Sequence, residues 1–215
     1  MNVVIETIAG IDEAGRGPLA GPVVAAVVLL HRGQKIEGVR DSKQLTAAQR
    51  ATAAGRIRAE ALEWAVGEAS REEIDELNIL QATLLAMGRA FSGLSRAPMR
   101  VEIDGNRAPG LADYPGLIET VVGGDRLRPA IAAASILAKV HRDGVMGRLH
   151  LAYPGYGFDR HKGYPTLDHR KALFALGPCP AHRRSFGPVR AAMRASQAPV
   201  SVPAAGPATA EKFRP

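Results

Sequence analysis

The sequence predicts an α/β fold in which helices pack on a mixed β-sheet. Residues 23–30 form a continuous apolar run rich in valine, which is typical of a strand covered on both faces. An earlier apolar stretch, 8–11, is followed by two acids and joined to this run by a short Gly- and Pro-rich connection, so these two strands can pair antiparallel. Two later strands, 99–103 and 118–122, follow helical segments, and strands separated by helices have to pair parallel.

Composition bounds the class of protein. The chain has 215 residues, 46% hydrophobic and 23% charged, which suits one domain with a real core. We expect a folded domain over 1–195 and a disordered Ala/Pro-rich tail over 196–215. The net charge of +7 favours a polyanionic partner. The lone Cys179, the lack of a signal peptide and the shortness of every apolar run predict a cytoplasmic protein without a membrane partner.

The helices of the first half are marked by capping signals. Residues 46–49 have capping-box spacing and open an Ala-rich helix to about residue 61, after a short strand at 36–39. Residues 62–69 alternate as a half-buried strand does. A second capping box at 70–73 starts a short helix to about residue 77, and Asn78 begins a longer one with an apolar face.

The second half is predicted to be mainly helical. Pro129 suits the first turn of a long helix that ends near residue 152, and shorter helices are expected at 168–176 and 189–195. The loop between 153 and 166 alternates aromatic with basic residues, as surfaces that grip nucleic acid do; a structural loop with one packed tyrosine is the alternative. The residues concerned are Tyr156, Phe158, Arg160, His161, Lys162 and Tyr164.

Acidic residues lie where strands of the predicted sheet end. Asp12, Asp104 and Asp125 each fall at the C-terminal end of a strand, and Glu13 follows Asp12 directly. Singly, each is explained by a solvated turn. Together they would repel one another at one sheet edge unless Mg²⁺ or Mn²⁺, which favour carboxylate oxygens, held them. Since neighbouring strand residues point to opposite faces, Asp12 and Glu13 can share a site only if the strand twists or ends there.

A glycine-rich turn follows the first acids. Gly15, Arg16 and Gly17 can form a backbone clasp on a sugar or phosphate, with a merely structural turn as the alternative. The glycine spacing excludes a dinucleotide-binding motif, because a strand and not a helix follows. Lys43 precedes a helix and can meet phosphate or be solvated. Taken alone, Ser135 and Lys139, one helical turn apart, are ordinary helix residues.

Eight segments in order resemble the bacterial type 2 ribonucleases H, the ribonuclease HII family. They are 10–18 (GIDEAGRGP), 41–45 (DSKQL), 73–80 (EIDELNIL), 103–106 (IDGN), 124–125 (GD), 133–140 (AASILAKV), 161–166 (HKGYPT) and 183–188 (RRSFGP). The resemblance implies a ribonuclease H-like mixed five-stranded sheet flanked by helices, with a helical C-terminal extension. It runs from about residue 8 to 190 and leaves only the tail uncovered.

The resemblance also implies an activity and a site. It implies an endonuclease that cleaves RNA in RNA–DNA hybrids and the 5′ side of ribonucleotides embedded in duplex DNA, leaving 5′-phosphate and 3′-hydroxyl ends. We expect the chain to be monomeric. Asp12, Glu13, Asp104 and Asp125 would be catalytic acids that hold two Mg²⁺ or Mn²⁺ ions. The implied substrate-binding residues are Gly15, Arg16, Gly17, Lys43, Ser135, Lys139 and Tyr164. The chain departs from the family near Asp125, where Gly123 replaces a frequent lysine and Ala130 a frequent acid.

Two other functions remain compatible with these residues. A junction resolvase or transposase-type nuclease would use similar acids at strand ends and would cut branched DNA. A non-catalytic nucleic-acid binder would keep the basic surface without Mg²⁺-dependent cleavage.

Overall fold

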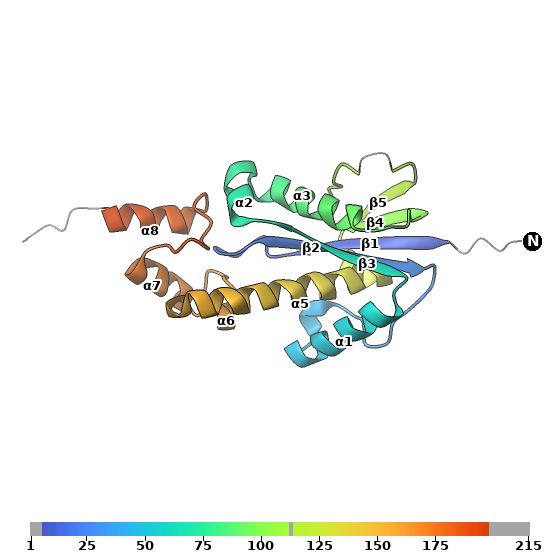
Figure 1. Cartoon of the computed structure of the whole chain (residues 1–215), viewed down its shortest axis with the longest axis horizontal. Coiled ribbons are helices and arrows are strands. Elements are labelled where there is room, and N and C mark those ends of the chain that lie inside the picture. The colour runs from blue at the N-terminus through green and yellow to red at the C-terminus, as the bar shows by residue number, and fades with distance from the viewer. Residues whose placement is uncertain (1–5, 112–113, 198–215) are drawn as a thin grey trace, which may run out of the picture.

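A single five-stranded sheet, in the order β3-β2-β1-β4-β5, runs through the molecule (Figure 1). The structure is a computed structural model and describes residues 6–111 and 114–197. β1 (Thr7–Ala14), β2 (Val23–His31) and β3 (Glu63–Ala69) form an antiparallel meander. β4 (Arg100–Asp104) and β5 (Leu117–Val121) continue the sheet parallel to β1. The mixed pairing predicted from the order of strands and helices is confirmed.

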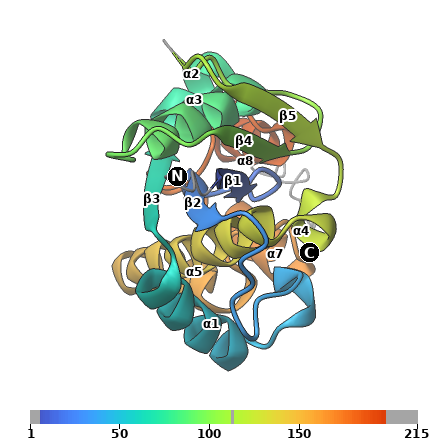
Figure 2. The ribbon, with the colours of Figure 1, turned by 90° about the vertical axis from the view of Figure 1, so that its right-hand side faces the viewer.

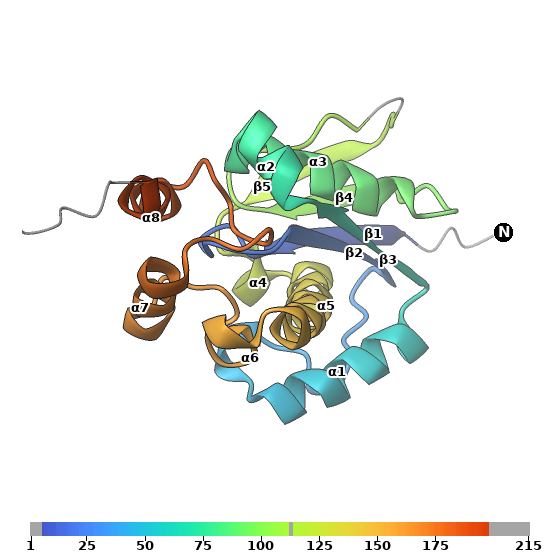
Figure 3. The same ribbon diagram turned by 60° about the vertical axis from the view of Figure 1, so that its left-hand side comes forward.

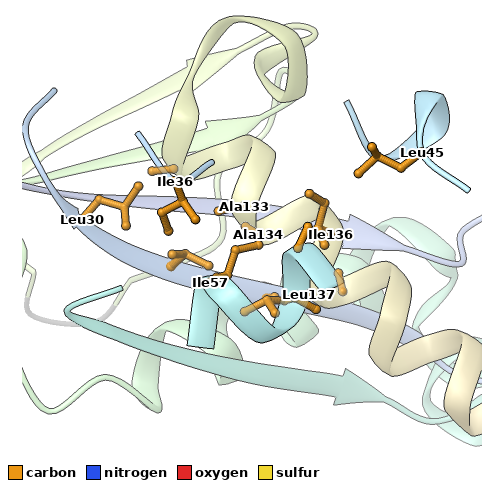
Figure 4. Packing of buried hydrophobic residues seen from close by; sticks show 14 of the residues in the cluster. Leu30, Ile36, Leu45, Ile57, Ala133, Ala134, Ile136 and Leu137 are labelled. Atoms are coloured by element: carbon orange, nitrogen blue, oxygen red, sulfur yellow. The ribbon is translucent and has the colours of Figure 1, made fainter. Parts of the chain in front are cut away.

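Helices cover both faces of this sheet (Figure 2). The long α5 (Pro129–Ala152) packs against β1 and β2, and α1 (Ala47–Glu60) lies outside it. The other face is covered by α2 (Arg71–Leu77) and α3 (Ile79–Ser92). Because β2 is buried on both sides, its alternate residues enter two separate cores, and Figure 4 shows the one beneath α5.

The capping signals act as the sequence indicates. The Thr46 hydroxyl accepts from the Gln49 amide while the Gln49 side chain accepts from the Thr46 amide, and Ser70 and Glu73 repeat this arrangement. Asn78, at φ 71°, ends α2 and caps α3 by accepting from the amides of residues 80 and 81.

Three expectations about the connecting segments are wrong. Residues 36–39 form a turn and not a strand; Ile36 packs into the core as part of a loop that leads to a 3-10 helix at Ser42–Gln44. The segment after α5 contains a 3-10 helix, Pro154–Tyr156, and α6 (Phe158–His161). The Tyr156 and Phe158 side chains are buried, because their rings stack on one another in a core cluster. They therefore offer no surface to nucleic acid.

The C-terminal part is helical, as expected. α7 (Leu167–Leu176) and α8 (Gly187–Gln197) lie beyond the end of the sheet opposite the N-terminus (Figure 3). α8 extends two residues past the expected start of the tail, and the rest of that predicted tail, 198–215, lies outside the described residues. In the described part of the chain, no helix has the length and apolarity needed to cross a bilayer.

Candidate functional site

One pocket collects almost all of the predicted site residues. It has a volume of about 310 Å³ and lies where β1 and β4 end, against α5 and the segment after α6. Every predicted site residue except Asp125 lines it. These residues are Asp12, Glu13, Gly15, Arg16, Gly17, Lys43, Asp104, Ser135, Lys139 and Tyr164. Segments far apart in the sequence thus converge at one edge of the sheet.

Two of the acids are brought together by the parallel pairing of β1 with β4. Ile11 is in register with Ile103, so Asp12 and Asp104 follow at the same level on neighbouring strands. Strand alternation turns both toward the face that α5 covers, because Ile11 and Ile103 belong to the core on the opposite face. The Asp12 side chain is buried there, and Ser135 of α5 lines the same pocket.

Glu13 reaches the same pocket from the other face of the sheet. β1 continues through Ala14, so the strand does not end between Asp12 and Glu13. β4, however, ends at Asp104, and no β4 residue lies beside Glu13. Its side chain lines the pocket and feels the negative charge of Asp104. The two adjacent acids share one site because the neighbouring strand ends early.

The acids repel one another in this setting. Burial raises the pKa of Asp12 well above its usual value, and the negative charges of Glu13 and Asp104 raise it further. Burial also raises the pKa of Glu13, although Arg16, at 3.3 Å from its carboxylate, opposes the rise. A nearby positive charge would relieve both effects. The pocket therefore has the donor chemistry and the electrostatic need for a divalent cation.

Each acid is at present bound to a donor of its own. Oδ1 of Asp12 accepts from the Glu13 amide at 2.7 Å, and Oδ1 of Asp104 accepts from the Gly124 amide at 2.7 Å. Consistent with these separate partners, no three His, Cys, Asp or Glu side chains within 6–111 and 114–197 are grouped closely enough to hold a metal ion.

Asp125 does not line the pocket that the other acids share. β5 ends at Val121, and Asp125 lies in the short helix α4 (Gly124–Leu127), so its expected place at the end of a strand is wrong. Its buried carboxylate accepts from the Lys43 ammonium at 3.1 Å and faces a neighbouring cavity of about 820 Å³. Lys43 itself lines the acidic pocket, so this ion pair connects Asp125 to it. That Asp125 shares a metal with Asp12 and Asp104 stays a prediction.

The glycine turn and Tyr164 also line the pocket, and Arg16 of the turn lies 3.3 Å from the Glu13 carboxylate. Gly15 adopts φ 99°, and a Cβ there would overlap the side chain of Arg142. A Cβ on Gly17 would lie 3.6 Å from the Tyr164 ring, which is 43% exposed. Of the three aromatic residues Tyr156, Phe158 and Tyr164, only Tyr164 is exposed. The flat ring of Tyr164 therefore lies beside the backbone of Gly17, which has no side chain to keep a ligand away.

Two polar residues that line the pocket, Ser42 and Arg50, were missed by the sequence reasoning. The Ser42 hydroxyl shares a hydrogen bond of 2.8 Å with Ser135, which connects the loop before α1 to the helix behind Asp12. Arg50, on α1, donates to the Ser42 carbonyl at 3.1 Å and holds this loop. Ser42 belongs to the family-like segment 41–45, which could have indicated that it lies at the site. Nothing in the local sequence pattern distinguished Arg50 from the solvent-exposed residues of the same helix.

Comparison with known proteins assigns this architecture to a family. The family described as Ribonuclease HII matches residues 9–189. Ribonuclease HII of Paracidovorax citrulli is 61% identical over 187 residues, covering 87% of this chain and 77% of that protein. The crystal structure of ribonuclease H2 from Pyrococcus horikoshii aligns with a TM-score of 0.75 at 28% identity, over 89% of this chain and 100% of the other.

A more distant structure shares the fold. Bst-RNase HIII, solved in complex with Mn²⁺, aligns with a TM-score of 0.69 at 18% identity, over 91% of this chain and 72% of its own. The family match, the curated relative and the fold agree with one another. The chain belongs to the ribonuclease HII family, whose members are endoribonucleases that hydrolyse RNA in RNA–DNA hybrids.

Proposed function

We propose that the pocket cleaves the RNA strand of hybrids and also the 5′ side of single ribonucleotides embedded in duplex DNA, leaving 5′-phosphate and 3′-hydroxyl ends. The observation that carries the proposal is the convergence of Asp12, Glu13 and Asp104 with a glycine clasp and an exposed tyrosine in one pocket. The acids suit phosphodiester hydrolysis, and the clasp suits contact with a sugar. The joint presence of the two supports an enzyme that selects its cleavage site by the sugar.

The carboxylates would hold Mg²⁺ or Mn²⁺, with Asp12, Glu13, Asp104 and Asp125 as ligands. Bound there, two such ions supply an acidified water and stabilise the leaving oxygen. The raised pKa values of Asp12 and Glu13 support this role, because burial and neighbouring carboxylates disfavour their negative charge, which a bound cation would stabilise. Without a cation, these acids would also repel the phosphate of the substrate.

The remaining residues would bind and select the nucleic acid. The 2′-hydroxyl is the group that distinguishes ribose from deoxyribose, so selectivity requires a contact at that position. Gly15, Arg16 and Gly17 offer a close backbone approach there, and the exposed face of Tyr164 offers a platform for the sugar. Lys43, Ser135 and Lys139 offer donors for the phosphate backbone. The net charge of +7 supplies affinity that weakens with salt.

We further propose that residues 1–195 are the catalytic unit and that the chain acts as a monomer in the cytoplasm, where bacterial chromosomal DNA lies. The family match over 9–189 supports the extent of the unit.

Asp104→Asn tests the assignment of the acids. It removes a negative charge from the pocket and keeps the shape of the side chain. We expect cleavage of a duplex with one ribonucleotide to be abolished, with Mg²⁺ or with Mn²⁺, while hybrid binding measured by fluorescence anisotropy is largely retained. Asp159→Asn, the same change at an exposed position on α6, is the matched control and keeps full activity.

Several outcomes of this experiment would count against the proposal. Retained turnover by Asp104→Asn would refute the role of the acids. Cleavage of a branched all-DNA substrate by the unaltered chain would favour the resolvase-type alternative. Binding without any cleavage in Mg²⁺ or Mn²⁺, with EDTA as the reference, would identify a non-catalytic binder.

A further inference from the structure

Two buried arginines lie behind the glycine clasp. The side chains of Arg183 and Arg142 are 0% and 1% exposed and are among the largest fully buried side chains of the described chain. Within 6–111 and 114–197, neither guanidinium has a carboxylate within salt-bridge distance. Burying a charge without a counter-charge is costly unless hydrogen bonds compensate, so these positions call for a specific reason.

The partners of Arg183 are backbone carbonyl groups of the clasp and of the turn that follows it. Its two terminal nitrogens donate to the carbonyl of Gly15 at 2.6 Å, of Arg16 at 3.0 Å and of Pro22 at 3.0 Å. Its Nε donates to the carbonyl of Gly21 at 2.9 Å. A planar guanidinium presents donors in a fixed fork, so it can fix several carbonyl directions at once.

The direction of these carbonyls determines where two amides point. All described peptide bonds are trans, so the carbonyl of one residue and the N–H of the next lie on opposite sides of the peptide. Since the carbonyls of Gly15 and Arg16 point at Arg183, the N–H groups of Arg16 and Gly17 point away from it. Neither N–H donates to an acceptor in the described part of the chain, and both residues line the acidic pocket.

Arg142 fixes the same region from α5. It donates to the carbonyls of Ala20 and Pro22, each at 3.1 Å, and to that of Lys162 at 3.0 Å. Lys162 lies two residues before Tyr164, so this side chain connects the clasp to the segment that carries the tyrosine. Both arginines pack against the turn, but only Arg183 donates hydrogen bonds to the carbonyls of the two peptides whose amides are free.

We infer that Arg183 is a positioning residue for ribose selection: it aims the N–H groups of Arg16 and Gly17 at the 2′-hydroxyl of the substrate. The inference rests on the proposed function of the clasp. A lysine at this position keeps the charge but lacks the fork. Arg183→Lys therefore leaves the turn without the bonds that orient both peptides at once.

The test compares binding of two duplexes that differ in one hydroxyl group. In the Asp104→Asn background, affinity is measured for a duplex with one ribonucleotide and for the same duplex made entirely of DNA. We expect Arg183→Lys to reduce the ratio of the two affinities by about tenfold, the effect of losing a hydrogen bond or two, with all-DNA binding unchanged. Arg184→Lys, the same change at the exposed neighbouring residue, is the control and keeps the ratio.

The outcomes separate this inference from the proposed function. A ratio of one in Asp104→Asn alone overturns the ribose-reading clasp, and the inference with it. A clear preference for the ribonucleotide that survives Arg183→Lys in a chain of unchanged melting temperature overturns the role of Arg183 only. A parallel loss of affinity for both duplexes also overturns it, because a purely structural plug would produce that result.

A second measurement does not depend on the folding of the variant. In ¹⁵N-labelled Asp104→Asn with Arg183 intact, the amides of Arg16 and Gly17 exchange rapidly with water in the free protein, since no acceptor protects them. We expect the ribonucleotide duplex to slow their exchange and shift their resonances, and the all-DNA duplex to leave both unchanged. Equal responses to the two duplexes would overturn the inference.

Discussion

Mild acid should destabilise the protein through one buried histidine. His182 is fully buried, and its Nδ1 accepts from the Cys179 amide at 3.1 Å. Its Nε2 must then carry the proton, which it donates to Nε2 of His169 at 3.1 Å; Nδ1 of His169 donates in turn to the Tyr164 carbonyl at 2.9 Å. Both rings are neutral in this chain of hydrogen bonds. A second proton on His182 would bind at Nδ1, where it would point at the Cys179 N–H and break that hydrogen bond.

The size of the effect follows from the pKa of His182. Burial, and next the neighbouring His169, lower this pKa from 6.5 to about 4. A lowered histidine pKa means that the unfolded chain binds the proton first, so the contribution to stability is complete above pH 6.5 and is lost as the pH falls toward 4. At pH 4.5 the loss amounts to about 2.5 kcal/mol of unfolding free energy.

Urea unfolding at pH 7.5 and pH 4.5 measures this loss. His182→Asn keeps an acceptor near the Cys179 amide but does not titrate, so it removes the pH-dependent part. The other titrating groups remain in both chains, so the difference between the two pH dependences reports the titration of His182 together with its coupling to His169. We expect the unaltered chain to lose about 2.5 kcal/mol more than the variant between the two pH values. Equal losses would refute the buried neutral state.

Three further changes have expected outcomes. Tyr164→Ala removes the exposed ring beside Gly17 and should reduce cleavage at a single embedded ribonucleotide much more than cleavage of a hybrid; equal losses on both substrates would contradict a sugar contact. Thr46→Ala removes the cap of α1 and should lower the unfolding free energy by about 1 kcal/mol, read from urea midpoints. Gly10→Ala places a Cβ 2.1 Å from the Ala130 carbonyl carbon and should cost about 2–3 kcal/mol by overpacking α5 against β1.

Matched variants control the two stability predictions. Thr52→Ala lies inside α1 and should be neutral or slightly stabilising, because its hydroxyl caps nothing and alanine favours a helix. Gly147→Ala on α5 points into open space and should stabilise by roughly 0.5–1 kcal/mol. Destabilisation by either control would show that the region tolerates no change, and would remove the specific meaning of the cap and of the close contact.

The parts of the fold that depend on local sequence pattern could be predicted from the sequence. The uninterrupted apolar run of β2 and the capping boxes at Thr46 and Ser70 are local signals, and each fixed the type of its element. The convergence of Asp12 and Asp104 followed from strand ends and parallel pairing. The specific roles of the pocket residues came from resemblance to a family, since no spacing rule distinguishes Lys43 or Ser135 from ordinary residues.

What the sequence concealed depends on tertiary contacts. Phe158 alternates with basic residues along the chain, yet it packs among buried histidines, because a ring gains more from burial than its local pattern reveals. Asp125 follows two glycines as a residue at a strand end would, but one of them, Gly123 at φ 69°, starts a helical turn instead. Arg183 belongs to a basic run that predicts exposure, and only its carbonyl partners, far away in the sequence, explain its burial.

The pairing of β1 with β4 links function to the order of folding. β1, β2 and β3 are neighbours in the sequence and can assemble early, whereas β4 must find β1 across three intervening helices and two strands. Such long-range pairing is slow, because the entropy of closing the loop is lost before the contacts form. Asp12 and Asp104 become neighbours only at that step. A refolding chain should therefore regain its helical circular dichroism before it regains nuclease activity. The delay between the two signals measures how long β4 takes to pair with β1.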